Sequence, residues 1–157
     1  HGPVYLRFGR PAVPNFTPEE QKFEIGKAIC MNEGTDVTIF ATGHLVWEAI
    51  NAAETLEAEG ISAEVIDIAT IKPLDEEAVI ASAKKTGAVV CAEEHNTCGG
   101  LGELVAGVLA ANAPTPMEFI NGADRFGQSG TPAELMKVYG LDAEHIVEAA
   151  KKAVARK

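Results

Sequence analysis

The 157-residue chain is poor in basic residues, in cysteine and in long apolar runs. Thirteen Lys and Arg against 23 Asp and Glu give a net charge of −10, which argues against nucleic acid and membrane surfaces as partners. No apolar run approaches the roughly 20 residues that a membrane helix needs. The sparse, odd set Cys30, Cys91 and Cys98 favours reduced thiols in the cytoplasm over a disulfide framework.

The remaining composition is that of a globular protein with a sizeable core. Apolar residues make up 46% and charged residues 23%. The chain begins at His1 without an initiator Met, directly on the strand-like run 4–8, which has no partner nearby in the sequence. We therefore expect a piece of a longer protein that starts inside a preceding domain. The alternative is a processing scar at an ordinary domain start.

Proline spacing indicates a domain boundary near the amino end. Pro11, Pro14 and Pro18 predict a rigid, extended linker over residues 11–22. Two strand-like runs follow, 23–31 and Val37–Ala41, separated by the short polar stretch NEGTD. This pattern predicts a β-hairpin, which would make the two strands antiparallel.

From Val37 onward strand-like and helix-like stretches alternate. Strands are predicted at 37–41, 63–68, 88–91 and 117–121, and helices at about 46–59, 76–86 and 102–112. Thr131 and Glu134 flank Pro132 in a capping box, and Asp142 precedes the last apolar helical stripe. Alternating elements form parallel sheets covered on both faces. We therefore predict an α/β three-layer αβα sandwich of about five strands, mostly parallel with one antiparallel edge strand.

The stretch 88–102 has the sequence AVVCAEEHNTCGGLG, which predicts a buried strand, a loop and the start of a helix. Ligands and partner surfaces usually meet α/β sheets at such a point. Its glycines do not form a phosphate-binding motif, and Glu93 and Glu94 would repel phosphate. A tight strand-to-helix turn is the favoured interpretation.

Catalytic and metal interpretations of this stretch are weak. His95 and Cys98 are spaced like two metal ligands, but a zinc site needs more ligands than the sequence supplies nearby. A Cys98–His95 nucleophile pair lacks an orienting Asp or Asn. Adjacent residues of a strand point to opposite sides, so Glu93 and Glu94 cannot share a proton. We identify no catalytic residue and no metal ligand.

The loops at this edge instead predict an interface. It comprises 42–44, 93–102 and 124–130, and its candidate residues are His44, Glu93, Glu94, His95, Gly99 and Gly100.

Several stretches together resemble the carboxyl-terminal part of transketolases: GPVYLRFGRPAVP, EGTDVTIFATG, GISAEVIDIATIKPLD, AEEHNTCGGLGE and DRFGQSGTPAELMKVYGL. They cover nearly the whole chain in one order and are especially similar to the separate C-terminal subunit of split bacterial and archaeal transketolases. The resemblance implies residues 1–10 as the last strand of a truncated pyrimidine-binding domain and 23–157 as the transketolase C-terminal domain.

The resemblance also implies a function. Transketolases move a two-carbon ketol unit between sugar phosphates of the pentose phosphate pathway, using thiamine diphosphate and Mg²⁺ held by the missing domains across a homodimer interface. Arg10, or Arg7 if the register slips, would contact the substrate, and this chain alone would bind no cofactor and be inactive. A 2-oxoacid dehydrogenase E1 β-chain, a deoxyxylulose-phosphate synthase and an autonomous small-molecule-binding domain are the alternatives.

Overall fold

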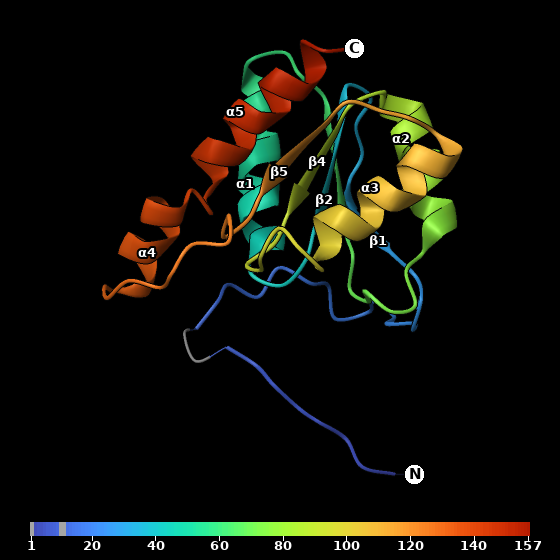
Figure 1. The fold of residues 1–157 in the computed structure, drawn as a ribbon. Helices are drawn as coiled ribbons and strands as arrows, with labels where there is room; N and C mark the ends of the chain where they lie inside the picture. Colours follow the sequence, from blue (N-terminus) through green and yellow to red (C-terminus); the bar gives the residue numbers. More distant parts are fainter. Residues whose placement is uncertain (1, 10–11) are drawn as a thin grey trace.

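The computed structural model describes residues 2–9 and 12–157 as an open sheet with helices on both faces (Figure 1). The elements in chain order are β1 (Ile29–Asn32), β2 (Val37–Ala41), α1 (Leu45–Ala58), β3 (Ala63–Asp67), α2 (Glu76–Thr86), β4 (Val89–Ala92), α3 (Leu101–Asn112), β5 (Met117–Ile120), α4 (Pro132–Tyr139) and α5 (Ala143–Val154). No helix in these two ranges is both long and apolar enough to cross a bilayer.

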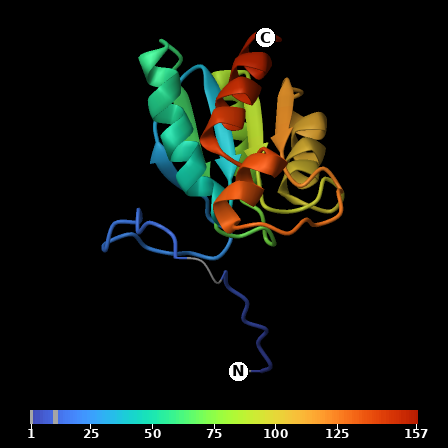
Figure 2. The same cartoon turned by 90° about the vertical axis from the view of Figure 1, so that its left-hand side faces the viewer.

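The sheet has the strand order β1-β3-β2-β4-β5. β1 is antiparallel to β3, and the other neighbours are parallel. One core lies between the sheet and helices α1 and α5, and a second lies between the opposite face and helices α2 and α3 (Figures 1 and 2). The predicted three-layer sandwich with one antiparallel edge strand is therefore confirmed.

The predicted hairpin is wrong, because β1 pairs with β3 and not with β2. The polar turn carries the chain across to the start of β3, where the N–H groups of Thr35 and Asp36 donate to the Ser62 carbonyl at 3.1 and 2.8 Å. The Asp36 carboxylate accepts the Ser62 N–H in return at 2.8 Å. All five residues of β2 are buried, which suits a central strand with a parallel neighbour on each side.

Helix ends follow the local signals in the sequence. Asp75 accepts the Ala78 N–H and begins α2, which ends at Gly87 in the left-handed conformation. Thr131 and Glu134 form the predicted capping box of α4. These bonds satisfy backbone groups that helix ends otherwise leave unpaired.

The amino-terminal residues 2–9 are exposed and belong to no strand in the described part of the chain, and they run away from the domain in Figure 1. Residues 12–22 of the predicted linker run below the sheet in Figure 1, and the Phe16 ring stacks on Trp47 of α1 with centroids 6.0 Å apart. The segment is therefore anchored to the domain at Phe16. The division at residues 10 and 22 stays a prediction.

Candidate functional site

The carboxyl ends of the four parallel strands share one edge of the sheet. Thr42 follows β2, Ile68 follows β3, Glu93 follows β4 and Asn121 follows β5. The Thr42 hydroxyl donates to the Ile68 carbonyl at 3.0 Å, which ties two of the loops together. The loops predicted as an interface therefore lie on a common surface, together with α4.

Glu93 is buried, with 3% of its surface exposed, and caps α3. Its carboxylate accepts the Leu101 N–H at 2.7 Å and the Gly102 N–H at 2.9 Å. A carboxylate at this position satisfies two unpaired donors and complements the positive end of the helix dipole. The Glu93 carboxylate is therefore engaged inside the loop, where it holds the loop in shape.

The glycines of the loop make room for this cap. A Cβ on Gly100 would lie 2.4 Å from a Glu93 carboxylate oxygen, and one on Gly102 would lie 2.6 Å from the Phe119 ring. Such distances are far below van der Waals contact. The structure thus shows a tight strand-to-helix turn, as expected, whose helix-end donors are occupied by a carboxylate of the chain itself.

Glu94 has a different partner from Glu93, as predicted, although both residues lie beyond the end of β4 and not on the strand. Its carboxylate lies 3.1 Å from Nδ1 of His44, and both side chains are partly exposed. The pair joins the loop after β2 to the loop after β4. A partly exposed contact of this kind contributes little stability, so its main significance is that it joins two loops of this edge.

The other residues of the loop do not assemble into a catalytic group. His95 is exposed, and its backbone carbonyl accepts the Gly122 N–H at 2.8 Å. The Cys98 thiol is also exposed, whereas Cys91 is fully buried in β4. Burial, with a smaller contribution from the charge of Glu93, raises the pKa of the Cys91 thiol and keeps it protonated. Neither cysteine has the surroundings of an activated nucleophile.

Two hollows flank the His44–Glu94 pair. One of about 660 Å³ lies beside Trp47, Met136 and Tyr139, and a second of about 450 Å³ lies beside Thr42 and His95. Arg7 lines both hollows. Arg10, the first choice for substrate binding, lies outside the described residues, so both arginine assignments stay predictions.

The loop after β5 has a fixed shape that the sequence did not reveal. Ala123 and Asp124 have φ values of 52° and 54°, which non-glycine residues rarely adopt. The Tyr139 hydroxyl donates to the Phe126 carbonyl at 2.7 Å, and the Arg125 guanidinium lies 4.8 Å above the Tyr139 ring. The Phe126 side chain is 99% exposed on this fixed backbone. A loop held by these contacts, with an exposed aromatic side chain, suits a protein contact.

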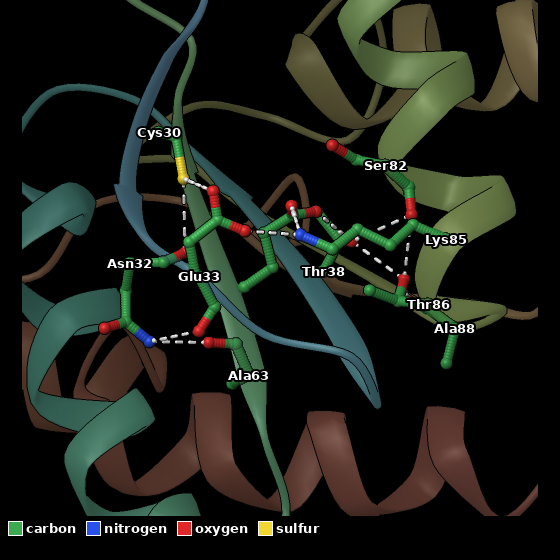
Figure 3. A network of polar contacts seen from close by, with 10 residues as sticks. Cys30, Asn32, Glu33, Thr38, Ala63, Ser82, Lys85, Thr86 and Ala88 are labelled. Atoms are coloured by element: carbon green, nitrogen blue, oxygen red, sulfur yellow. Dashed lines mark hydrogen bonds and ion pairs between the residues drawn. The ribbon is translucent and has the colours of Figure 1, made fainter.

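A polar cluster at the opposite end of β3 is the second place where chemistry-bearing side chains gather (Figure 3). Lys85 donates to Glu33 at 2.5 Å and to the buried Glu64 at 2.8 Å, and Glu64 also accepts the Thr38 hydroxyl at 2.9 Å. Cys30, Glu33 and Glu64 are the only three metal-ligand side chains that converge within the described ranges. The Lys85 ammonium already contacts both carboxylates, so this cluster fits a structural ion-pair network better than a metal site.

Comparisons with known proteins match this chain to one domain family. The family model described as "Transketolase, C-terminal domain" matches residues 26–146. The 6-deoxy-6-sulfo-D-fructose transketolase subunit SqwH of Clostridium sp. (strain MSTE9) is 47% identical over 156 residues, 99% of this chain and 48% of that protein. A 1-deoxy-D-xylulose-5-phosphate synthase of Heliobacterium modesticaldum (strain ATCC 51547 / Ice1) is 35% identical over 153 residues, 96% of this chain and 24% of that protein.

A solved structure supports the same relationship. A split gene transketolase, described as an inactive beta4 tetramer, has a TM-score of 0.90 and 46% identity over 93% of this chain and 48% of that chain. The chain therefore spans about half the length of the first relatives that it matches.

Proposed function

This chain belongs to the transketolase C-terminal domain family, and we propose that it works as that domain of an enzyme that transfers a two-carbon ketol unit between sugar phosphates. The observation that carries the proposal is 47% identity over 99% of the chain to a transketolase subunit. That relative is named for 6-deoxy-6-sulfo-D-fructose, an anionic ketose. The substrate class proposed here is accordingly an anionic ketose with an aldose acceptor, and the pathway is the pentose phosphate pathway.

The proposed cofactors, thiamine diphosphate and Mg²⁺, are assigned to the rest of the enzyme. Glu93 occupies the donors at the start of α3, and its negative charge there disfavours a diphosphate. At the other end of the sheet, Lys85 already forms ion pairs with the converging carboxylates of Glu33 and Glu64. In the part of the chain that the structure describes, neither group of residues therefore fits thiamine diphosphate or Mg²⁺.

The role proposed for the domain is that of a scaffold. The carboxyl-edge loops, with His44, Glu94, His95 and Gly99 near the surface and Glu93 and Gly100 buried beneath them, would contact the catalytic part of the enzyme. The loop at Phe126 and the anchored linker at Phe16 support this arrangement. The proposed assembly is a homodimer of the whole enzyme in the cytoplasm. The related beta chain that forms a tetramer supports self-association of this chain when it is alone.

The isolated chain should fold and yet show no ketol transfer. It has two hydrophobic cores, and Glu93, Glu33 and Glu64 are engaged in contacts within the chain. The measurement compares ketose consumption, with thiamine diphosphate, Mg²⁺ and sugar phosphates, for the chain alone and for the chain joined to the upstream domains. Urea unfolding of the isolated chain is the control for folding. Turnover by the isolated chain would contradict the proposal.

The relative named as a deoxyxylulose-phosphate synthase supports a second parent reaction, at lower identity. Product analysis of the joined enzyme separates the two reactions. Ketol transfer to an aldose phosphate supports the proposal, whereas formation of 1-deoxy-D-xylulose 5-phosphate supports the second candidate.

Replacing Arg10 by alanine in the joined enzyme should mainly raise KM for phosphorylated sugars. A guanidinium binds a phosphate through charge-assisted hydrogen bonds, and losing such a contact should raise KM roughly tenfold with a smaller change in kcat. Arg7→Ala is the matched control, since Arg7 is the alternative at this edge. An unchanged KM for Arg10→Ala together with a raised KM for Arg7→Ala would move the assignment to Arg7.

A further inference from the structure

The predicted linker is held to the domain by one side chain along most of its length. Within residues 12–20, Phe16 alone is partly buried and its neighbours are exposed. The Phe16 and Trp47 ring planes are inclined by 24°, and the 6.0 Å between their centroids lies in the range of about 4.5–7 Å that is favourable for aromatic pairs. Phe16 also packs against the core beneath α1 and α5. The contact is therefore a specific anchor.

The helix turn that carries Trp47 is fixed by buried neighbours. Leu45, Val46 and Ala49 of the same stretch of α1 are buried in the core with at most 1% of their surfaces exposed. This end of α1 follows the central strand β2 after only the short loop 42–44. Trp47 is therefore positioned by the interior of the domain, and a contact with it transmits that position to the linker.

The far end of the linker is bound to the domain without Phe16. The Gly26 N–H donates to the Thr70 hydroxyl at 2.9 Å, and the Ala28 N–H donates to the Asp75 carboxylate at 3.1 Å. The segment whose position depends on Phe16 is therefore the one that precedes it. In that segment Ala12, Val13 and Pro14 border the hollow of about 660 Å³ beside Trp47.

The connection from Phe16 back to Arg10 is short and rich in proline. Five residues separate the two, and Pro11 and Pro14 are among them. The ring of proline fixes φ, so such a connection has fewer conformations than an ordinary stretch of the same length. A restraint on Phe16 therefore also restricts where the preceding residues can lie.

We propose that Trp47, acting through Phe16, positions the arginine that binds the anionic group of the substrate. The inference rests on the proposed function and on its assignment of that contact to Arg10. The upstream domain holds the chain before this arginine, and the Phe16–Trp47 stack holds the chain after it. A binding group that is correctly placed for only part of the time lowers the apparent affinity by that fraction. Trp47 is thus a positioning residue and does not touch the substrate.

The test measures KM in the joined enzyme for a ketose phosphate and for the same ketose without its phosphate, at a saturating concentration of acceptor. Trp47→Ala and Phe16→Ala should each raise KM for the ketose phosphate at least about threefold, with a smaller change in kcat. KM for the neutral ketose should stay unchanged, because it lacks the group that the arginine binds. Trp47→Phe should restore most of the affinity, since it keeps a ring that can stack on Phe16.

Two further variants separate positioning from a general effect on the fold. If Trp47 acts through Arg10, adding Trp47→Ala to Arg10→Ala should raise KM less than about twofold beyond Arg10→Ala alone. Ile50→Ala is the matched control, because Ile50 lies on the same helix and packs against the same core but does not line the hollow. It should lower the stability of the domain and leave KM unchanged.

A spectroscopic readout is independent of turnover. Trp47 is the single tryptophan of the chain, so the fluorescence of the isolated chain reports on its surroundings. Phe16→Ala should shift the emission to longer wavelength, because the indole becomes more exposed to water. Circular dichroism checks that the variant is folded.

Any of five results would overturn the inference. They are an unchanged emission in Phe16→Ala, an unchanged KM for the ketose phosphate in both alanine variants, an equal rise of KM for the neutral ketose, independent effects of Trp47→Ala and Arg10→Ala, and an equal rise of KM in Ile50→Ala. A lack of ketol transfer by the unmodified joined enzyme would instead contradict the proposed function, which the emission measurement does not use.

Discussion

Gly34→Ala should destabilise the domain by at least about 3 kcal/mol, or prevent it from folding. A Cβ on Gly34 would lie 2.1 Å from the Ala63 carbonyl carbon and 2.2 Å from the Glu64 nitrogen. Both atoms belong to the backbone of β3, in the interior of the sheet between β1 and β2. A side chain could rotate away from the added methyl group, but a backbone held by strands on both sides cannot.

The measurement is the free energy of unfolding from urea titration. Gly107→Ala is the matched control, because the same substitution there meets no atom within 4 Å and should stabilise the helix by about 0.5–1 kcal/mol. The position of Gly34 relative to β3 is wrong if the two variants have similar stability.

The contact at Gly34 also explains why one part of the topology could not be predicted from the sequence. The stretch NEGTD separates two strand-like runs at hairpin distance, and local turn rules favour pairing those runs. The competing bonds to Ser62 come from a residue 26 positions away from Asp36. Helix ends were predictable because their signals are local, as with Asp75 and Thr131. Strand neighbours depend on which distant segment supplies a better partner.

The candidate site was predictable to a similar extent. Glu93 and Glu94 do have different partners, as predicted, but both lie beyond the end of β4, so strand alternation is not the reason. The glycines correctly indicated a tight turn. The sequence did not show that Glu93 turns inward to cap α3, because the cap depends on the path of the loop between residues 93 and 101. It also did not show the bond between Tyr139 and Phe126, which joins a loop to a helix 13 residues later.

Glu93→Ala should lower the free energy of unfolding by about 3 kcal/mol or more. The substitution leaves the N–H groups of Leu101 and Gly102 buried without an acceptor, and each bond to a charged group contributes roughly 1.5–3 kcal/mol. Glu93→Gln should cost less, about 1–3 kcal/mol, because the amide keeps one acceptor oxygen but directs a donor at the second N–H.

Glu94→Ala is the control for this series, since it removes an adjacent carboxylate whose side chain is 43% exposed and paired with His44. Its cost should stay below about 1 kcal/mol. If Glu93→Ala cost no more unfolding free energy than Glu94→Ala, the capping role of Glu93 would be wrong.

The two variants should also differ in the mobility of the loop in the joined enzyme. Glu94→Ala changes only a surface side chain, whereas Glu93→Ala releases the whole loop from 95 to 100. Amide hydrogen exchange should therefore rise along this loop and the first turn of α3 in Glu93→Ala alone.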